Sequence, residues 1–541
     1  MKKLILTLLL THLLVNAYSQ YQWAKHIGAN SFYGNESSNA ITDDTNTYLI
    51  GQYGNALYLP NDTLYSSGLN DIFIVKFDQN GNEIWSKTLG GNFSQPSAFE
   101  GAGGVFDPVN NCIYIAGSYI NSITLGATTL ISNNTNTDDI FVARMDLNGN
   151  FIWAKKGGGA GADYVINIRV NPYGKVYLVS QTTDSAYFGT YHLGPGGGIV
   201  QYDATGNLLS AEIKFTSPYN SASDVFLNFI NTDLIMYGLF KINPFHIDTA
   251  TLVSKGDYDG FVARADSMGH IKWIKTFGGT GLDGVQSLSI DNNNNLFITG
   301  AFNDSINLGG LHLVNTGNDI LIAKYNQNGT AIWARNIHAS GANEYPGTIV
   351  SDANGNCYIT GGFSGNASFG SNAVSTTYAN DMFLTRYDSS GNCLGVVHFG
   401  EGYGSSLAVD NSGSVYVNGD FDNSVTIGSN NFTSYGGYDI FLTKLDIKLN
   451  VKDKRMSTNN TLTIYANPNK GTCNITVPDD LLHEDNLVLK IFDTNGKLIQ
   501  QLPVTIDQEK IKINIQEEAT GVYNVTLGNS KKMYSGKIVF E

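Results

Sequence analysis

The sequence predicts an all-β fold: a seven-bladed β-propeller closed by the N-terminal strand, followed by a small C-terminal β-sandwich. Two observations lead to this prediction. Glycine is abundant, with 60 residues, and charged residues make up only 15% of the chain, which indicates many turns and strands. All five tryptophans occupy one slot of an internal repeat, and such a repeat decides the architecture before chain length does. They are Trp23, Trp85, Trp153, Trp273 and Trp333.

One repeat is divided between the two ends of the predicted propeller. Four of the tryptophans follow, by fourteen residues, an aspartate that opens an apolar run, as in DIFIVKFDQNGNEIWSK from Asp71. The run that opens at Asp439 has no such tryptophan after it, and Trp23 has no such run before it. A closed ring explains this division, because the first strand can complete the last unit and remove the free edge. Trp23 is therefore the predicted closure residue.

The tryptophan slot recurs seven times, at intervals of 57 to 68 residues, with Ser210 and Gly395 in place of the indole in two units. Each unit contains four strand-like segments. Tight Asp/Asn/Gly turns join the first to the second and the third to the fourth, and longer connections join the rest. Because strand direction alternates, the longer connections share one end of the ring, here called the long-loop face. A ligand site is expected there, since variable loops on a rigid scaffold usually carry binding.

Two segments carry a family resemblance, GNCYITGGF from Gly355 and NDIFIVKFDQNGNEIW from Asn70. They resemble the bacterial β-propeller repeat (SBBP-like), and the resemblance covers residues 20–447. It implies a fold but no particular activity.

The first nineteen residues predict a signal peptide. Lys2 and Lys3 precede an apolar stretch, and Ala17-Tyr18-Ser19 has the form of a cleavage site. The mature chain is expected to begin at Gln20 and to pass through the periplasm. No segment approaches the ~20 apolar residues that a membrane-spanning helix needs, so no transmembrane segment is predicted.

After residue 447 the repeat stops, and a basic linker (448–460) leads into residues 461–541. This tail contains TIYANPNKGTCNITV, VLKIFDTNGKLIQQ and GVYNVTLGNSKKMYSGKIVF. These segments resemble the type A C-terminal sorting domain of the type IX secretion system of Bacteroidetes. The resemblance implies handling by the type IX secretion machinery, removal of the domain, and a secreted, extracellular or cell-surface protein. The matching residues are Asn467, Pro468, Gly471, Asp493, Gly496, Lys497, Gly521, Val522, Tyr523 and Lys537.

An acidic residue lies shortly before the first tight turn of every unit. These acids would gather at the channel mouth of the long-loop face and bind a ligand or a cation, for which calcium is the best match to oxygen ligands. The alternative is that each acid satisfies backbone amides in its own loop. The seven are Glu36, Glu100, Asp163, Asp224, Asp283, Glu344 and Glu401.

Other motifs favour structural roles. The recurrent aspartates that open the third strands are predicted to cap turns or strands. No HExxH or GxSxG motif is present, so no catalytic residue is predicted. The cysteines Cys112, Cys357, Cys393 and Cys473 are dispersed, which predicts no metal site and no cofactor apart from calcium. The formal charge of −15 disfavours nucleic acid as a partner.

These observations favour a secreted or cell-surface, non-enzymatic protein that binds a glycan or a surface protein. The alternative is a propeller hydrolase or lyase that acts on polysaccharide, which would need two carboxylates about 5 to 10 Å apart in a pocket. A third possibility is a scaffold within a larger surface assembly.

Overall fold

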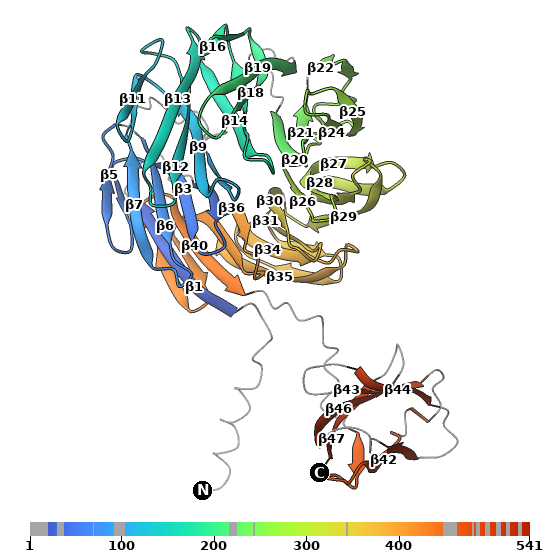
Figure 1. Ribbon diagram of the computed structural model, residues 1–541. Coiled ribbons are helices and arrows are strands. Elements are labelled where there is room, and N and C mark those ends of the chain that lie inside the picture. Colours follow the sequence, from blue (N-terminus) through green and yellow to red (C-terminus); the bar gives the residue numbers. More distant parts are fainter. Residues whose placement is uncertain are drawn as a thin grey trace. The chain divides into compact units, whose positions relative to one another are not determined.

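The computed structural model is all-β and divides into two compact units, residues 1–449 and 450–541 (Figure 1). Across its described residues, no helix has the length and apolar character needed to span a bilayer. The structure describes residues 20–29, 37–68, 70–90, 103–215, 224–241, 244–341, 344–446, 462–478, 481–482, 487–492, 498–504, 510–514, 520–528 and 533–540. The predicted signal peptide, Glu36, Glu100, Asp493, Gly496, Lys497 and the linker lie outside these residues.

Among the described residues of the first unit, seven sheets each contain four antiparallel strands in the order first, second, third, fourth. The first strands are β2 (Ser37–Thr42), β8 (Gly103–Asp107), β14 (Asp163–Val170), β20 (Asp224–Ile230), β26 (Ser287–Ile290), β30 (Tyr345–Ser351) and β36 (Tyr403–Val409). The second strands are β3 (Thr47–Tyr53), β9 (Cys112–Tyr119), β15 (Val176–Thr182), β21 (Asp233–Phe240), β27 (Leu296–Asn307), β31 (Cys357–Phe363) and β37 (Val415–Phe421).

The third strands are the most buried, as their continuous apolar runs predict. Every residue of β6, for example, is buried. The third strands are β6 (Asp71–Phe77), β12 (Asp139–Asp146), β18 (Gly196–Tyr202), β24 (Asp259–Ala265), β28 (His312–Tyr325), β34 (Asp381–Tyr387) and β40 (Asp439–Asp446). The fourth strands are β7 (Glu83–Leu89), β13 (Phe151–Gly159), β19 (Leu208–Phe215), β25 (Ile271–Phe277), β29 (Ala331–Ala339), β35 (Cys393–Glu401) and β1 (Gln20–Ala29).

Strand β1, from the start of the chain, is the fourth strand of the sheet that ends with β40. Figure 1 shows the blue β1 beside the orange β40. Trp23 pairs with Lys444 in this register, and its ring is 9% exposed in a core formed with Tyr416, Phe73 and Phe77. Residues from the two ends of the repeat region therefore share one hydrophobic core.

Short hairpins from the second-to-third connections reach the fourth strand of the preceding sheet. Strand β16 pairs with β13, β4 with β1, β22 with β19 and β32 with β29. These hairpins cover edges that would otherwise be open to pairing. The hairpins that pair in this way are β4–β5 (Ala56–Tyr58, Thr63–Tyr65), β16–β17 (Ala186–Phe188, Tyr191–Leu193), β22–β23 (Phe245–Ile247, Ala250–Leu252) and β32–β33 (Asn366–Phe369, Asn372–Ser375). Two more hairpins, β10–β11 (Ser122–Leu125, Thr128–Ile131) and β38–β39 (Ser424–Ile427, Asn430–Thr433), form separate two-stranded sheets.

Side chains on the first strands hydrogen-bond to the backbone of the neighbouring first strand. Asn39 of β2 donates to Gly104 O (2.8 Å) and accepts from Gly104 N (3.1 Å). The amide of Ala40 donates to Ser406 Oγ of β36 (3.1 Å). All seven first strands line one central cavity of about 580 Å³. Further bonds of this kind join Asn167 to Leu227, Asn228 to Leu288, Ser287 to Ile349 and Thr348 to Ser405.

The tryptophan slot contacts the third-to-fourth turn of the next sheet. The indole of Trp333 lies over Gly391, which has φ +80°, and Trp333 Nε1 donates to Ser389 O (3.1 Å). Lys324, which pairs with Trp333, donates to the same carbonyl (3.4 Å). The same arrangement places Trp23 on Gly81, Trp85 on Gly149, Trp153 on Gly206 and Trp273 on Gly329.

The second unit contains two sheets, β41-β42-β45 and β44-β43-β46-β47. Both contribute to one buried cluster that includes Ile475, Ile513, Leu489 and Val525. The strands are β41 (Thr463–Tyr465), β42 (Thr472–Thr476), β43 (Leu487–Phe492), β44 (Leu498–Val504), β45 (Lys510–Asn514), β46 (Gly521–Gly528) and β47 (Met533–Phe540).

Candidate functional site

Five tyrosines on the long-loop face of two neighbouring sheets are taken together as the candidate site, here called the tyrosine cluster, and ring contacts join three of them. The Tyr345 and Tyr403 ring centroids are 5.2 Å apart, and those of Tyr403 and Tyr438 are 5.9 Å apart. Four members are exposed to solvent by 39 to 59%. All five lie at first-strand starts or just before third strands, which is the long-loop face. The members are Tyr345, Tyr378, Tyr403, Tyr435 and Tyr438.

Glycine makes the loops of this cluster possible. Gly402 precedes Tyr403, and a Cβ at this position would lie 2.2 Å from Asp420 O. Its amide donates to Asn380 O (3.2 Å), and its carbonyl accepts the Tyr345 hydroxyl (3.0 Å). The backbone at Gly402 therefore connects the loops that carry the tyrosines.

Asn380 contributes a polar group beside the rings. It is 8% exposed, and its Nδ2 donates to the Tyr345 hydroxyl (3.1 Å). Its Oδ1 is buried and has no hydrogen-bond partner among the described residues. Buried polar atoms are usually satisfied, so this acceptor marks a place where a water molecule would be stabilised.

Carboxylates surround the cluster. Burial raises the pKa of Tyr438, and the nearby Tyr403, Asp422 and Glu401 raise it further. Asp381, below the same loops, accepts from His398 Nδ1 (2.9 Å) and Gly400 N (2.9 Å). This hydrogen bond to Asp381 raises the pKa of His398. The cluster therefore combines exposed aromatic rings with a negative local potential.

The predicted acids have different surroundings. Asp283 accepts the amides of Gly279 (2.7 Å) and Asn303 (3.0 Å), and Asp163 accepts the amide of Gly159 (2.7 Å). Among the residues that line the central cavity in the described part of the chain, none is one of the seven acids. Glu401 lies beside the tyrosine cluster, while Asp224 is described only as a backbone position in β20.

Asp163 lies with other aspartates at the start of β14. It is fully buried, and its Oδ1 has no partner among the described residues. Burial raises the pKa of Asp163 to about 7, and the charges of Asp139, Asp184 and Asp138 add to this shift. Burial also raises the pKa of Asp139 to about 6, although the Asn133 amide and Lys156 oppose the shift.

Among the predicted acids that the structure describes, Glu344 also has a strongly raised pKa. It is 9% exposed, and its Oε1 has no partner among the described residues. Burial raises the pKa of Glu344 to about 7, and the charge of Asp319 raises it further. Glu344 directly precedes Tyr345 of the tyrosine cluster in the sequence.

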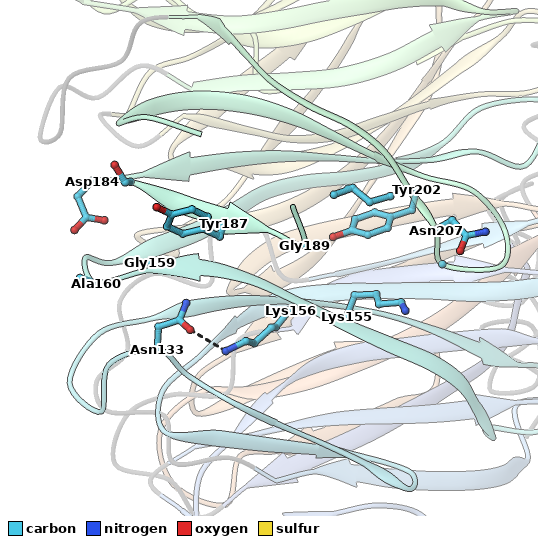
Figure 2. A pocket seen from close by; sticks show the side chains of 13 residues that line it. Asn133, Lys155, Lys156, Gly159, Ala160, Asp184, Tyr187, Gly189, Tyr202 and Asn207 are labelled. Carbon is cyan, nitrogen blue, oxygen red and sulfur yellow. Dashed lines mark hydrogen bonds between the residues drawn. The ribbon is translucent and has the colours of Figure 1, made fainter. Parts of the chain in front are cut away.

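A pocket of about 1010 Å³ lies between β13 with its added hairpin and the turn before β19. Figure 2 shows Lys156 bonded to Asn133, with Tyr187, Tyr202 and Asp184 around the pocket. Lys156 Nζ donates to Ile131 O (2.9 Å) as well as to Asn133 Oδ1 (2.8 Å). Its ammonium therefore already has protein partners.

Four of the recurrent third-strand aspartates, Asp71, Asp139, Asp259 and Asp439, accept an amide of the preceding loop, in agreement with the predicted capping role. Asp71 accepts from Ser67 N (2.7 Å), and Asp439 accepts from Tyr435 N (2.9 Å). Three of the recurrent third-strand aspartates bind a histidine of the adjacent fourth strand, which the sequence did not predict. The pairs are His26–Asp439 (2.6 Å), His338–Asp319 (2.8 Å) and His398–Asp381 (2.9 Å).

Within the described residues, no group of three or more His, Cys, Asp or Glu side chains is arranged to hold a metal ion. Cys112, Cys357, Cys393 and Cys473 are free thiols, and three of them are buried.

The described sorting residues converge on the edge of β47. Asn467 Nδ2 donates to Lys537 O (2.7 Å), and Val539 N donates to Asn467 Oδ1 (2.7 Å). Asn469, after Pro468, accepts the amide of Gly471 (2.8 Å). In β46, Tyr523 is buried, while Gly521 and Val522 are exposed. The motif thus joins the start of the second unit to its last strand.

The C-terminal residues 463–541 match the family described as Secretion system C-terminal sorting domain. Over 155 residues the chain is 26% identical to an uncharacterized WD repeat-containing protein of Acanthamoeba polyphaga mimivirus, a match that covers 26% of this chain and 11% of that protein. The chain thus spans about a tenth of the length of this curated relative.

Three solved structures are similar at low identity. The Dos1 propeller is 11% identical, with a TM-score of 0.39 and coverage of 79% of this chain and 95% of that one. The polysaccharide lyase Uly1 is 7% identical, with a TM-score of 0.39 and coverage of 79% and 98%. A Xanthomonas campestris gluconolactonase is 10% identical, with a TM-score of 0.28 and coverage of 62% and 91%. The type IX sorting domain at residues 463–541 indicates export to the cell surface or the medium.

Proposed function

We propose that this protein is a secreted or cell-surface binding protein whose first unit is a seven-bladed β-propeller closed by β1. The proposed propeller belongs to the SBBP-like class of a Bacteroidetes bacterium. It crosses the periplasm, is exported by the type IX machinery through its C-terminal β-sandwich, and binds a glycan or a surface protein without catalysis.

The pairing of β1 with β40 and the Ala40–Ser406 bond support ring closure. The observation that carries the binding function is the exposed tyrosine cluster. Tyrosine has an apolar ring and a polar hydroxyl, and it is enriched where proteins bind partners. Single exposed apolar side chains need no explanation, but a group of four on one face indicates an interaction site.

The alternative enzymatic function has its best support in Asp139 and Asp163, whose raised pKa values are of the kind that acid catalysis uses. Both carboxyl groups are fully buried, so neither can contact a polysaccharide. Binding is therefore the better supported function. We also propose that the acidic residues of the long-loop face bind calcium. Ligand binding is therefore to be measured with calcium and with chelator.

A binding screen tests the proposed function. The chain from Gln20 onward is presented to polysaccharides and to purified surface proteins of the native host. We expect a ligand whose binding is lost in Tyr378→Ala/Tyr435→Ala and kept in Tyr173→Ala, which changes an exposed tyrosine in a tight turn of the opposite end. A ligand that is lost only in Tyr173→Ala would contradict a site on the long-loop face.

A further inference from the structure

We propose that the ligand of the tyrosine cluster is a neutral polysaccharide. This inference rests on the proposed binding function and names its ligand class. The first argument is the shape of the exposed surface. Tyr403 and Tyr438 meet edge to face, and Tyr435 forms a second aromatic pair with Tyr58 at 4.9 Å. An extended chain of sugar rings matches two separate aromatic pairs better than one compact ligand does.

The second argument is the chemical match between sugar and site. A pyranose ring has C–H faces and a rim of hydroxyl groups, so it needs apolar surface beside hydrogen-bonding atoms. The tyrosine rings give the apolar surface, and tyrosine hydroxyls can both donate and accept. Asn380 Nδ2 donates to the Tyr345 hydroxyl (3.1 Å) and so fixes the orientation of this hydroxyl beside the exposed rings.

The third argument is charge. Glu401 and Asp422 act on Tyr438, and Asp420 and Asp381 act on Tyr345. The whole chain has a formal charge of −15. A field of this sign repels uronate and sulfate groups. The negative field therefore disfavours acidic polysaccharides as ligands and favours uncharged ones.

Loop construction supports a fixed binding surface. The Tyr435–Tyr438 loop turns through Gly436 and Gly437, with φ +142° and +91°. Tyr435 N is held by Asp439 (2.9 Å), and the Tyr435 ring stacks on His26 at 5.2 Å. Because these contacts orient the rings before a ligand arrives, less conformational entropy is lost on binding.

The test compares neutral with acidic polysaccharides. Laminarin, mannan and starch are the neutral probes, and alginate and heparin are the acidic ones. Affinity electrophoresis and calorimetry measure binding to the chain from Gln20 onward. We expect at least one neutral probe to bind and both acidic probes to fail. Loss of two stacking rings in Tyr403→Ala/Tyr438→Ala should weaken binding by about tenfold or more, while Tyr173→Ala should have no effect.

A second variant separates ring contact from misfolding. Tyr403→Phe/Tyr438→Phe keeps both rings and should retain most of the affinity, with an unchanged melting temperature. Failure of all neutral probes to bind, or equal binding by wild type and the double alanine variant, would overturn the polysaccharide proposal. If the same variants instead abolish binding to a purified surface protein, the general binding function stands and only the ligand class is wrong.

Discussion

Each repeat tryptophan stabilises the contact between sheets through several local interactions. For four of the tryptophans, the indole N–H and the cation of the paired third-strand residue donate to one carbonyl of the next sheet, as Trp153 (3.0 Å) and Arg144 (2.7 Å) do to Ala204 O. The indole of Trp23 donates to Gln79 O (2.9 Å). The glycine under the indole has positive φ, a conformation that costs little only without a Cβ. Base, glycine and tryptophan of the repeat therefore act together at these four contacts.

The two repeats that lack a tryptophan can be explained in the same way. In the Ser210 unit, Lys214 lies on the turn glycine Gly269 and donates to Met268 O (2.8 Å). The sheet that follows Gly395 has no third-to-fourth turn, because its third and fourth strands are β40 and β1 from opposite ends of the chain. An indole at 395 would therefore have no turn glycine to cover.

Substitution of the turn glycine tests this packing. In Gly391→Ala the new Cβ would lie 2.7 Å from the Trp333 ring, at φ +80°. Gly413 has φ +83°, but its Cβ position has no atom within 4 Å. We expect Gly413→Ala to cost about 1 to 2 kcal/mol from backbone strain alone. Gly391→Ala should cost about 1 to 3 kcal/mol more from overpacking, measured by urea denaturation. Equal losses would contradict the packing role.

The raised pKa of Asp163 predicts a pH dependence of stability. With a folded pKa of about 7, this carboxyl binds its proton more tightly in the folded protein than in the unfolded chain, where its pKa is near 3.9. Stability from this group is therefore lost as pH rises from about 4 to 7. Asp163→Asn removes the ionisation and should stabilise the protein at pH 8 by roughly 1 to 3 kcal/mol, with little gain at pH 4. Thermal unfolding at both pH values measures it.

A control of opposite sign accompanies this measurement. Burial acts to raise the pKa of Asp203, but the hydrogen bonds from Thr205 and Asn207 together outweigh it and lower the pKa to about 2. Its stabilisation is present above pH 4 and is lost as pH falls toward 2. Asp203→Asn should therefore destabilise at pH 7 and not at pH 2. A gain for Asp163→Asn that is equal at pH 4 and pH 8 would refute the proton-binding explanation.

At the scale of elements, sequence prediction succeeds where the signal is local. The tight turns follow from their Asp, Asn and Gly residues, and Asp78 indeed accepts the amides of Asn80 (2.8 Å) and Asn82 (2.8 Å). Third strands follow from continuous apolar runs. The pairing of β1 with β40 was predictable because the divided repeat leaves one unit incomplete at each end.

The tyrosine cluster was not predictable in the same way. Its members come from four separate chain segments. Tyr345 and Tyr403 occupy equivalent positions at the starts of two consecutive first strands, but the other first strands begin with other residues, so no regular periodicity reports the cluster. The loop sequences TYAND and SYGGYD, in two consecutive units, place a tyrosine shortly before the third-strand aspartate, and Tyr258 directly precedes Asp259 in a third unit. The acids, by contrast, recur at a visible position, but recurrence cannot distinguish a loop cap such as Asp283 from an acid beside a ligand site such as Glu401.

Removal of β1 tests the proposed closure. Deletion of residues 20–27 exposes the edge of β40 and removes the Trp23 side chain from its core. Loss of a buried tryptophan alone costs about 3 to 5 kcal/mol, and the freed edge adds a risk of aggregation. We expect a clear fall in the melting temperature by calorimetry. Trp23→Phe is the graded control and should lose less. An unchanged melting temperature in the deletion would refute closure.

At the scale of the whole molecule, the two units have different roles. The first presents loops on a scaffold of repeated contacts, and the second carries the sorting motif at the end of the chain. Asn467 and Lys537 are 70 residues apart, yet the Asn467 side chain bonds to the backbone of β47. The sequence resemblance identified both residues but not the contact between them, because only the fold brings the two ends of this unit together.

Removal of the second unit tests the proposed export route. A chain that ends at residue 460 keeps the predicted signal peptide and the entire repeat region, so it should cross the inner membrane and fold. Without the sorting domain, the type IX machinery has nothing to bind, and the protein should accumulate in the periplasm of the native host. Immunoblots of periplasm, cell surface and medium measure its distribution. A finer control is Asn467→Ala, which breaks the bonds to β47 and should reduce export while leaving the repeat region intact. Equal surface or medium levels of truncated and full-length protein would refute the sorting role of residues 461–541.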